Sequence, residues 1–423
     1  MSTENRKQSR MNFFKMIERQ EAKRIALLED GIPCTYGELT AAALRKKEHL
    51  QSGNGLMPGT VFPVQAETIG EQLILFLAVS AADAVPLLVP GDLKTVPNAE
   101  EIPEHACMAV MTSGSTGAPK VLYRRYESWA DYFPVQNEIF GIDADTRLFA
   151  HGSLAFTGNL NLYMGAFFTG AMVIAENKMN PRVWEKRIRE HHANAIYLIP
   201  SKLRLLPKAM RETCPAVRHI ISGSESLGRE EAAVLKQRFP EAEIILYYGA
   251  SELNYITYVT DREMGEDRSL VGKPFPQVEI FVDHGEIFVN TAYHVEGIQC
   301  PYSLSDTGYL DDAGNLYFSG RSDDIVNIHG RKISTFKIQK ALELFPEVEE
   351  AAVVLAERAH GKKLYGYVIC SEEHKCTPPE QIRSCLMEKL RERLAAYELP
   401  ARIVIVESLP RNESGKVNFH KLK

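Results

Sequence analysis

The spacing of apolar residues along the first three quarters of the chain predicts alternating helices and strands. Apolar positions between 72 and 79 follow a helical period. Short apolar runs at 171–175, 195–199, 217–221 and 244–248 have the length of buried strands. Alternation of this kind predicts an α/β fold in which sheets are flanked by helices.

The pattern changes in the last third of the chain. Between about 285 and 320, short apolar runs are separated by turn signals such as 311–315, which predicts an antiparallel or barrel-like β section. Farther on, apolar residues recur every four positions from Ile382 to Leu394, on a helix expected to end at 397–400, and strands are expected at 349–355, 364–370 and 403–406. This pattern predicts a small α+β domain at the end of the chain.

We therefore predict two domains, 1–322 and 323–423. The length of 423 residues supports this division, because it exceeds what one hydrophobic core usually serves.

Composition and charge exclude several classes of partner. The net charge is −6, with 49 Lys and Arg against 55 Asp and Glu and no basic run, so we expect no nucleic-acid partner. No segment reaches the roughly 18 consecutive apolar residues of a membrane helix, and the polar N-terminus lacks a signal-peptide stretch. We expect no membrane insertion and a cytoplasmic location. The seven scattered cysteines form no CxxC pair and indicate reduced thiols rather than a zinc site or a disulfide framework.

A loop rich in glycine and hydroxyl residues follows the apolar run 106–111 and ends in a lysine. Glycines let several backbone N–H groups point into one concavity, hydroxyls add donors and the lysine adds positive charge, so the loop suits phosphate. A nucleotide P-loop is excluded, because Pro119 precedes the lysine and Val121 follows it. Taken alone, the segment could also be a plain surface loop. The residues expected to bind phosphate are Thr112, Ser113, Gly114, Ser115, Thr116, Gly117 and Lys120.

Three further segments could bind the rest of a nucleotide, although each alone is more often a turn. One strand ends at an aromatic residue and a glycine turn followed by Glu252, whose carboxylate oxygens suit a hard cation on phosphate. Another strand leads into a small-residue segment that a flat ring could approach. Farther along, Asp306 could accept both ribose hydroxyls, and Arg321 could fork onto ribose or phosphate. The residues concerned are Ser222, Gly223, Ser224, Tyr247, Tyr248, Gly249, Ser251, Glu252, Asp306 and Arg321.

In their order along the chain, these segments resemble the motifs of the adenylate-forming superfamily, which includes acyl-CoA synthetases, aryl-acid ligases, peptide-synthetase adenylation domains and firefly luciferase. Together with 35–39 and a C-terminal segment around Lys416, the matching motifs span residues 35 to 417. The chain departs from the family at Ser251, where threonine is usual, and at 304–306, where only the aspartate of Thr-Gly-Asp is kept. Its shorter loops indicate a compact member of the family.

The resemblance implies a role for each motif in binding ATP and Mg²⁺. Tyr248 would lie against adenine, Asp306 would bind ribose with Arg321 as its charged companion, and Glu252 would help to hold Mg²⁺. Lys416 would reach into the active site during adenylation, so the residues implied in catalysis are Lys416, Glu252 and Thr116. Asp323 corresponds to the hinge about which the C-terminal domain rotates, and Gly330 lies in the loop that this rotation presents to the thiol tunnel.

The resemblance also places an acid pocket at Phe156, Thr157 and Asn159. Thr157 falls where amino-acid-activating relatives keep an aspartate, and a buried ammonium without a carboxylate is costly, so a free α-amino acid is disfavoured. Thr157 and Asn159 could hydrogen-bond a hydroxylated aryl or hydroxyacyl acid. Alternatively, both residues merely cap the helix that follows. His151 is nearer to this pocket than the paired histidines at 191 and 192, but it could equally have a structural role at the end of a strand. No histidine is assigned to catalysis.

These features predict an enzyme that activates a small non-amino carboxylic acid, aryl or acyl, with ATP. The acyl-adenylate forms with release of pyrophosphate, and its acyl group passes to the phosphopantetheine thiol of CoA or of an acyl or aryl carrier protein. The alternatives are an acyl-CoA synthetase acting strictly on free CoA and a non-catalytic nucleotide-binding relative. Nothing specific in the sequence favours luciferase-like oxygenation.

Overall fold

The computed structural model describes residues 11–53, 55–91, 93, 101–112, 120–321, 324–328, 331–358, 361–411 and 417–422. The chain divides into two compact units. The larger unit comprises Met1–Ile280 and Val289–Tyr302, and the smaller unit comprises Phe281–Phe288 and Ser303–Lys423. The functional boundary between 322 and 323 stays a prediction.

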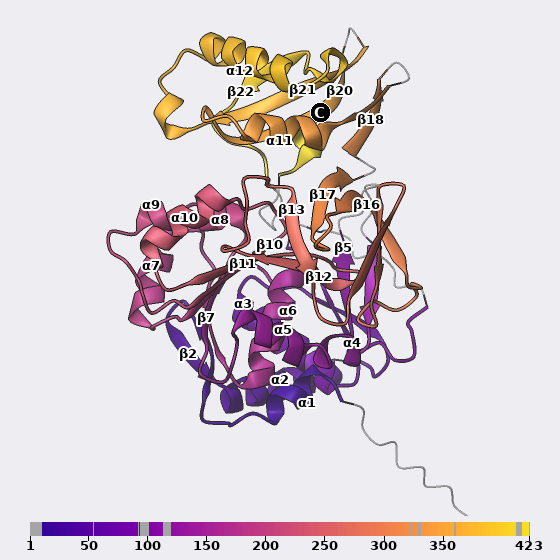
Figure 1. The fold of residues 1–423 in the computed structure, drawn as a ribbon. Coiled ribbons are helices and arrows are strands. Elements are labelled where there is room, and N and C mark those ends of the chain that lie inside the picture. The colour runs from indigo at the N-terminus through magenta and orange to yellow at the C-terminus, as the bar shows by residue number, and fades with distance from the viewer. Residues whose placement is uncertain are drawn as a thin grey trace, which may run out of the picture. The chain divides into compact units, whose positions relative to one another are not determined.

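The larger unit is a mixture of helices and parallel strands, as the apolar pattern predicts (Figure 1). Its helices are α1 (Phe13–Glu18), α2 (Tyr36–Ser52), α3 (Ile69–Ala81), α4 (Glu127–Ala130), α5 (Phe133–Phe140), α6 (Thr157–Thr169), α7 (Pro181–Glu190), α8 (Pro200–Leu203), α9 (Leu206–Ala209) and α10 (Arg229–Arg238). Its strands are β1 (Ile25–Glu29), β2 (Ile32–Thr35), β3 (Val61–Val64), β4 (Val85–Leu88), β5 (Met108–Thr112), β6 (Lys120–Arg124), β7 (Arg147–His151), β8 (Met172–Glu176), β9 (Ala195–Tyr197), β10 (His219–Gly223), β11 (Glu243–Ala250), β12 (Asn254–Thr260) and β13 (Leu270–Pro274).

The main sheet of the larger unit has the strand order β13-β12-β11-β10-β9-β7-β8-β1-β2. Neighbours from β11 to β1 are parallel, whereas β12 and β2 pair antiparallel with β11 and β1. Parallel strands are covered on both faces, which accounts for their continuous apolar runs. The strand predicted at 195–199 ends earlier, at Tyr197, because Pro200 begins α8.

One face of this sheet packs against α7, α9 and α10, which lie together in Figure 1. Trp184 of α7, Leu206 of α9 and Leu235 of α10 belong to one buried core with the inward side chains of the strands. The buried strand residues of this core include Phe149, Ile174, Ile196, Ile220 and Ile244. Burial of this apolar surface fixes the carboxyl ends of β10 and β11, where the candidate residues of 222–224 and 247–252 lie.

A second sheet has the order β3-β4-β5-β6, parallel up to β5 and antiparallel between β5 and β6. Helix α3 contacts strands of both sheets and so lies between them (Figure 1). Its prediction from residues 72–79 is confirmed, and it begins after Thr68, whose side chain accepts a hydrogen bond from the Glu71 N–H. The β5–β6 hairpin holds the two ends of the predicted phosphate loop.

The smaller unit contains the expected antiparallel section and the α+β section. Its elements, with three strands (β14, β15 and β16) that cross the unit boundary, are β14 (Glu279–Asp283), β15 (Glu286–Asn290), β16 (Tyr302–Leu310), β17 (Leu316–Arg321), β18 (Ile325–Ile328), β19 (Arg331–Ser334), α11 (Thr335–Glu343), β20 (Val348–Arg358), β21 (Gly361–Cys370), α12 (Pro379–Arg393) and β22 (Arg402–Ile405). Strand β21 pairs antiparallel with β20 and parallel with β22. One core joins this sheet to α11 and α12.

The four-residue repeat on α12 is confirmed, since Ile382, Leu386 and Leu390 are buried in that core. The predicted end of this helix at 397–400 is wrong. Helix α12 ends at Arg393, and residues 396–398 form a separate 3₁₀ turn. A residue of another helix holds this turn: Lys337 of α11 donates hydrogen bonds from Nζ to the Glu398 carboxylate at 2.7 and 2.9 Å.

No helix in the described part of the chain is long and apolar enough to cross a membrane.

Candidate active site

The ends of the predicted phosphate loop are fixed by the β5–β6 hairpin. The backbone of Thr112 pairs with that of Lys120, and the Lys120 side chain is exposed at the start of β6. The remaining residues assigned to this loop, Ser113, Gly114, Ser115, Thr116 and Gly117, lie outside the described residues. Their role in binding phosphate stays a prediction.

The end of β10 forms a tight backbone approach, as expected for residues 222–224. Ser222 is fully buried and donates a hydrogen bond from Oγ to the Leu198 carbonyl at 2.7 Å. A Cβ at Gly223 would lie 2.5 Å from the ring of Tyr247, so only glycine fits there. Ser224 has a φ of +72°, a left-handed conformation that turns the chain away from the strand.

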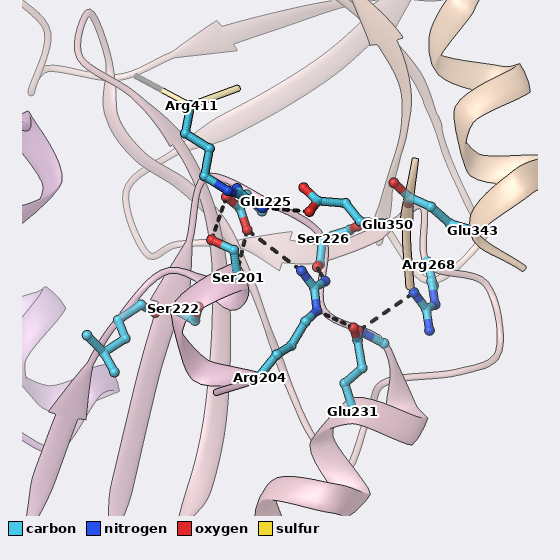
Figure 2. A network of polar contacts seen from close by, with 12 residues as sticks. Ser201, Arg204, Ser222, Glu225, Ser226, Glu231, Arg268, Glu343, Glu350 and Arg411 are labelled. Carbon is cyan, nitrogen blue, oxygen red and sulfur yellow. Dashed lines mark hydrogen bonds and ion pairs between the residues drawn. The ribbon is translucent and has the colours of Figure 1, made fainter. Parts of the chain in front are cut away.

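A polar network supports the loop that follows β10. Glu225 accepts hydrogen bonds from the backbone N–H and the hydroxyl of Ser201, at 2.8 and 3.0 Å. Figure 2 shows Arg204 lying between Glu225 and Glu231, and its Nε is 2.6 Å from a Glu231 oxygen. Arg204 also donates to the Ser226 carbonyl at 3.1 Å. The network thereby ties the small-residue segment to the helices beside it.

Two tyrosine hydroxyls meet between β9 and β11. The hydroxyls of Tyr197 and Tyr247 are 2.9 Å apart, and the Tyr255 ring packs edge-on against Tyr247 at 4.7 Å. Burial raises the pKa of Tyr247 to about 12 and raises the pKa of Tyr197 as well. Both hydroxyls are therefore neutral at physiological pH and can donate hydrogen bonds.

The segment after Tyr248 leaves the regular ladder. The β11–β12 register shifts between Tyr248 and Gly249, and a Cβ on Gly249 would lie 2.6 Å from the Asn254 carbonyl oxygen. Bulges of this kind redirect side chains next to active sites. Beyond the bulge, Ser251 Oγ donates a hydrogen bond to Thr157 Oγ1 at 3.0 Å, and Glu252 is half-buried. The structure thus brings the predicted nucleotide motif and the predicted acid pocket into contact.

The acid-pocket residues lie at the start of α6. Thr157 is its first residue and Phe156 its N-cap, without a side-chain cap hydrogen bond. Asn159 is buried and donates from Nδ2 to the Ser153 carbonyl at 3.0 Å. The interpretation that Thr157 and Asn159 cap the helix is therefore wrong, because Phe156 holds the cap position and Asn159 instead fixes the loop before it.

Asp306 and Arg321 belong to the smaller unit, where they face each other across the β16–β17 ladder. Arg321 Nε donates to Asp306 Oδ1 at 3.1 Å, and the Asp306 side chain is 1% exposed against 58% for Arg321. The buried carboxylate thus has a charged companion, as predicted from the motif. Asp323, Gly330 and Lys416 lie outside the described residues, and their roles stay predictions.

The sequence analysis missed a buried arginine close to these motifs. Arg124, the last residue of β6, is 1% exposed and donates from Nη2 to the Ser251 carbonyl at 2.7 Å. The sequence offers only a weak signal for it: Arg124 follows the apolar residues 121–123 directly, within the segment that forms β6.

Two ionisable groups lie at the carboxyl end of β7. His151 is buried, and its Nδ1–H donates to the Glu176 carbonyl at 2.7 Å. Burial, with the positive charge of Lys202 as a second cause, lowers the pKa of His151 to about 4. The imidazole is therefore neutral at physiological pH, in agreement with a structural role at the strand end.

We expect Lys202→Met to stabilise the protein by about 1–2 kcal/mol at pH 7. Burial lowers the pKa of Lys202 from 10.5 to about 8, although the negative charge of Glu225 partly offsets this. The Lys202 ammonium donates to the His151 carbonyl at 3.3 Å. Below pH 8 the folded state bears the cost of a buried charge. Between pH 8 and 10.5 the folded protein loses this proton while the unfolded chain keeps it, so wild-type stability rises and the gap to the variant closes.

Denaturant unfolding across pH 7 to 10.5 checks this, with the exposed Lys208→Met as the matched control. A stability difference for Lys202→Met that does not shrink over this range would contradict it.

Residues 90–291 match the family described as AMP-binding enzyme, and residues 337–416 match the AMP-binding enzyme C-terminal domain. The chain is 27% identical over 338 residues to the uncharacterized acyl–CoA ligase YhfT of Bacillus subtilis (strain 168), covering 76% of this chain and 69% of that protein.

Two solved structures share the fold. One is o-succinylbenzoate coenzyme A synthetase (MenE) from Bacillus subtilis in complex with ATP and magnesium, with a TM-score of 0.81, 20% identity and coverage of 96% of this chain and 98% of that chain. The other is ATP-bound MatB from Rhodopseudomonas palustris, with a TM-score of 0.81, 19% identity and coverage of 97% and 98%.

Proposed function

This chain belongs to the adenylate-forming superfamily and is an AMP-forming ligase of a carboxylic acid and a thiol, and we propose that its acid is a small one without an amino group. The observation that carries the proposal is the hydrogen bond between Ser251 and Thr157. It joins the motif assigned to the nucleotide with the residues assigned to the acid. An acid beside Thr157 would therefore lie next to the nucleotide.

The reaction has two steps. In the first, a carboxylate oxygen of the acid attacks the α-phosphorus of ATP, a new oxygen–phosphorus bond forms, and pyrophosphate leaves with the electrons of the broken bond. In the second, a thiol sulfur attacks the acyl carbon, AMP leaves, and a thioester remains. Neither step needs a nucleophilic side chain, so the protein contributes positioning and electrostatic stabilisation.

Each motif then has a defined task in our proposal. The 112–120 segment holds the β- and γ-phosphates, the Ser222–Ser224 segment and Tyr248 enclose the adenine, and Asp306 with Arg321 binds the ribose. Lys416 donates to the acid and α-phosphate oxygens as negative charge develops between them. Asp323 serves as the hinge that afterwards withdraws Lys416 and brings the Gly330 loop to the thiol.

The donor set fits Mg²⁺. Glu252 is a half-buried carboxylate on the turn beside Thr157, and Mg²⁺ in nucleotide sites usually takes one or two carboxylates with phosphate oxygens as further ligands. The described residues contain no group of three or more His, Cys, Asp or Glu side chains that could hold a metal by themselves. When bound, Mg²⁺ offsets negative charge on the phosphates.

The tyrosine pair favours a small acid. Gly158 follows Thr157, and a Cβ added there would lie 2.5 Å from the Tyr197 hydroxyl and 3.0 Å from the Tyr247 hydroxyl. The space behind Thr157 is thus filled by aromatic side chains. One hydroxyl of the tyrosine pair donates to the other, which leaves one proton to donate to a polar substituent of the acid. A long acyl chain would have to displace them, which well-packed side chains resist.

We expect Tyr247→Ala to shift acid preference towards larger acids. Removing the ring clears space behind Thr157, so kcat/KM for a longer acid such as octanoate should rise at least about tenfold relative to that for a short hydroxy acid. Tyr248→Ala is the control, since it should weaken ATP binding without changing the order of acids. An unchanged acid ranking in Tyr247→Ala would remove Tyr247 from the pocket wall.

The thiol acceptor in our proposal is a phosphopantetheine arm, either of CoA or of an acyl or aryl carrier protein. Two features support it: the C-terminal family match over 337–416 and the relative named as an acyl–CoA ligase. The two acceptors carry the same thiol. An experiment must therefore distinguish them by supplying either free CoA or a carrier protein that bears the phosphopantetheine arm.

The test is acid-dependent release of pyrophosphate across aryl, short acyl and long acyl acids, with and without CoA. Release that requires a small acid and accelerates with CoA supports a CoA ligase. Release that CoA leaves unchanged but that a phosphopantetheinylated carrier protein accelerates supports carrier loading. No release with any acid would contradict the proposal and favour a non-catalytic nucleotide-binding protein.

A further inference from the structure

Arg124 is a buried cation whose side chain donates hydrogen bonds to residues outside its own strand. It ends β6, four residues after Lys120, and is 1% exposed. Its Nη1 donates to the Tyr293 carbonyl at 2.9 Å and to Ser128 Oγ at 3.2 Å. Its Nη2 donates to the Ser251 carbonyl at 2.7 Å, and the guanidinium carbon lies 5.4 Å from the centre of the Trp129 ring. The planar fork thus reaches two separate backbone segments at once.

The three segments that meet at Arg124 are also joined by their backbones. Glu296 N–H donates to the Tyr123 carbonyl at 2.8 Å, and Val295 N–H donates to the Glu252 carbonyl at 2.8 Å. Residues 293–296 therefore bridge β6 and the 251–252 turn, and Arg124 closes the third side by its bond to Ser251. We call these segments, 123–124, 251–252 and 293–296, the Arg124 junction.

The charges of the junction favour the same arrangement. Glu252 carries a negative charge that attracts the Arg124 guanidinium, while burial lowers the pKa of Arg124 to about 9. The guanidinium is therefore charged at neutral pH. Both terminal nitrogens of Arg124 donate hydrogen bonds, whereas its buried Nε has no partner among the described residues. Removing the guanidinium would leave the Ser251 and Tyr293 carbonyls without this donor.

We propose that Arg124 is a positioning residue that holds the Glu252 turn in a fixed register with the β5–β6 hairpin. The hairpin carries the predicted phosphate loop between Thr112 and Lys120, and the turn carries the carboxylate assigned to Mg²⁺. With both anchored to one side chain, the described end of the hairpin at Lys120 and the Glu252 carboxylate are held in a fixed relation. The inference rests on the proposed function for the role of Glu252.

The test compares Arg124→Gln and Arg124→Lys with Arg125→Gln. Arg125 is the adjacent residue, is 40% exposed, and lies 3.8 Å from Glu296, so it controls for loss of a positive charge at this place. ATP affinity is measured by calorimetry with and without Mg²⁺, followed by the KM values for ATP and acid and the thermal midpoint of unfolding.

Arg124→Gln should reduce the Mg²⁺-dependent gain in ATP affinity by about tenfold or more. Arg124→Lys should fall between Arg124→Gln and wild type, because an ammonium keeps the charge but cannot fork. Arg125→Gln should match wild type.

A merely structural role gives a different pattern. In that case the thermal midpoint and total activity fall together, and the Mg²⁺-dependent gain in ATP affinity of the folded variants stays at the wild-type value, which would overturn the inference. Arg124→Lys keeps a buried cation in place and so provides a folded variant if Arg124→Gln unfolds. Failure of the proposed function appears elsewhere, as wild-type protein that binds Mg²⁺–ATP but turns over no acid.

Discussion

Replacement of Lys416 by alanine is expected to lower acid-dependent release of pyrophosphate by about 10²- to 10³-fold. The lysine ammonium would donate to oxygens on which negative charge develops only in the transition state. Ground-state binding of ATP has no such contact in our proposal, so the dissociation constant of ATP should change by less than about threefold. Single-turnover formation of AMP and equilibrium binding of ATP measure the two quantities.

Lys421→Ala is the matched control for this variant. Lys421 is an exposed lysine of the same C-terminal segment, five positions later. Its replacement by alanine therefore removes the same charge from this segment. We expect Lys421→Ala to retain wild-type turnover. Turnover in Lys416→Ala equal to that of the control would remove Lys416 from the mechanism, whereas loss of ATP binding in both variants would indicate a general charge effect.

The second large effect is expected for Glu252→Gln. The amide keeps the size of the side chain but lacks the charge that a hard cation prefers, so the Mg²⁺ concentration for half-maximal rate should rise by about 10- to 100-fold. A rate loss that added Mg²⁺ partly restores is the signature of a weakened ligand. The measurement is a Mg²⁺ titration of pyrophosphate release at saturating acid.

Glu296→Gln controls for this substitution, because Glu296 lies in the adjoining 293–296 segment and pairs with exposed Arg125. We expect its Mg²⁺ titration to follow that of wild type. If Glu252→Gln also follows wild type, Glu252 is not a ligand of the metal, and the family-based assignment of this carboxylate fails.

Much of the fold could be predicted from local sequence pattern. The helix at Ile69–Ala81 has an apolar period, and the strands that begin at Met172 and Glu243 have continuous apolar runs. Both patterns are visible without any knowledge of tertiary contacts. The repeat on α12 was equally plain. Its end was not, because Lys337 fixes Glu398 from a position 61 residues away in the chain.

The candidate site likewise contains residues that the local sequence pattern reveals and contacts that it does not. Motif residues such as Ser222 and Ser251 could be singled out because they follow predicted strands, and Tyr247 because it lies near the end of one. Arg124 could not be placed, since its partners Ser251 and Tyr293 lie 127 and 169 residues away. Likewise the Tyr197–Tyr247 hydroxyl pair spans 50 residues and depends on the parallel register of β9, β10 and β11. Contacts of this range follow from topology, which local pattern does not specify.

The most direct test of the central claim is isotope exchange between pyrophosphate and ATP, measured with and without a small carboxylic acid and in the absence of any thiol. Formation of an enzyme-bound acyl-adenylate makes the first step reversible, so we predict exchange that depends on the acid and on Mg²⁺ and that is lost in Lys416→Ala. Exchange that is absent with every acid, in protein shown to bind ATP, would contradict the assignment of this chain as an acid-activating ligase.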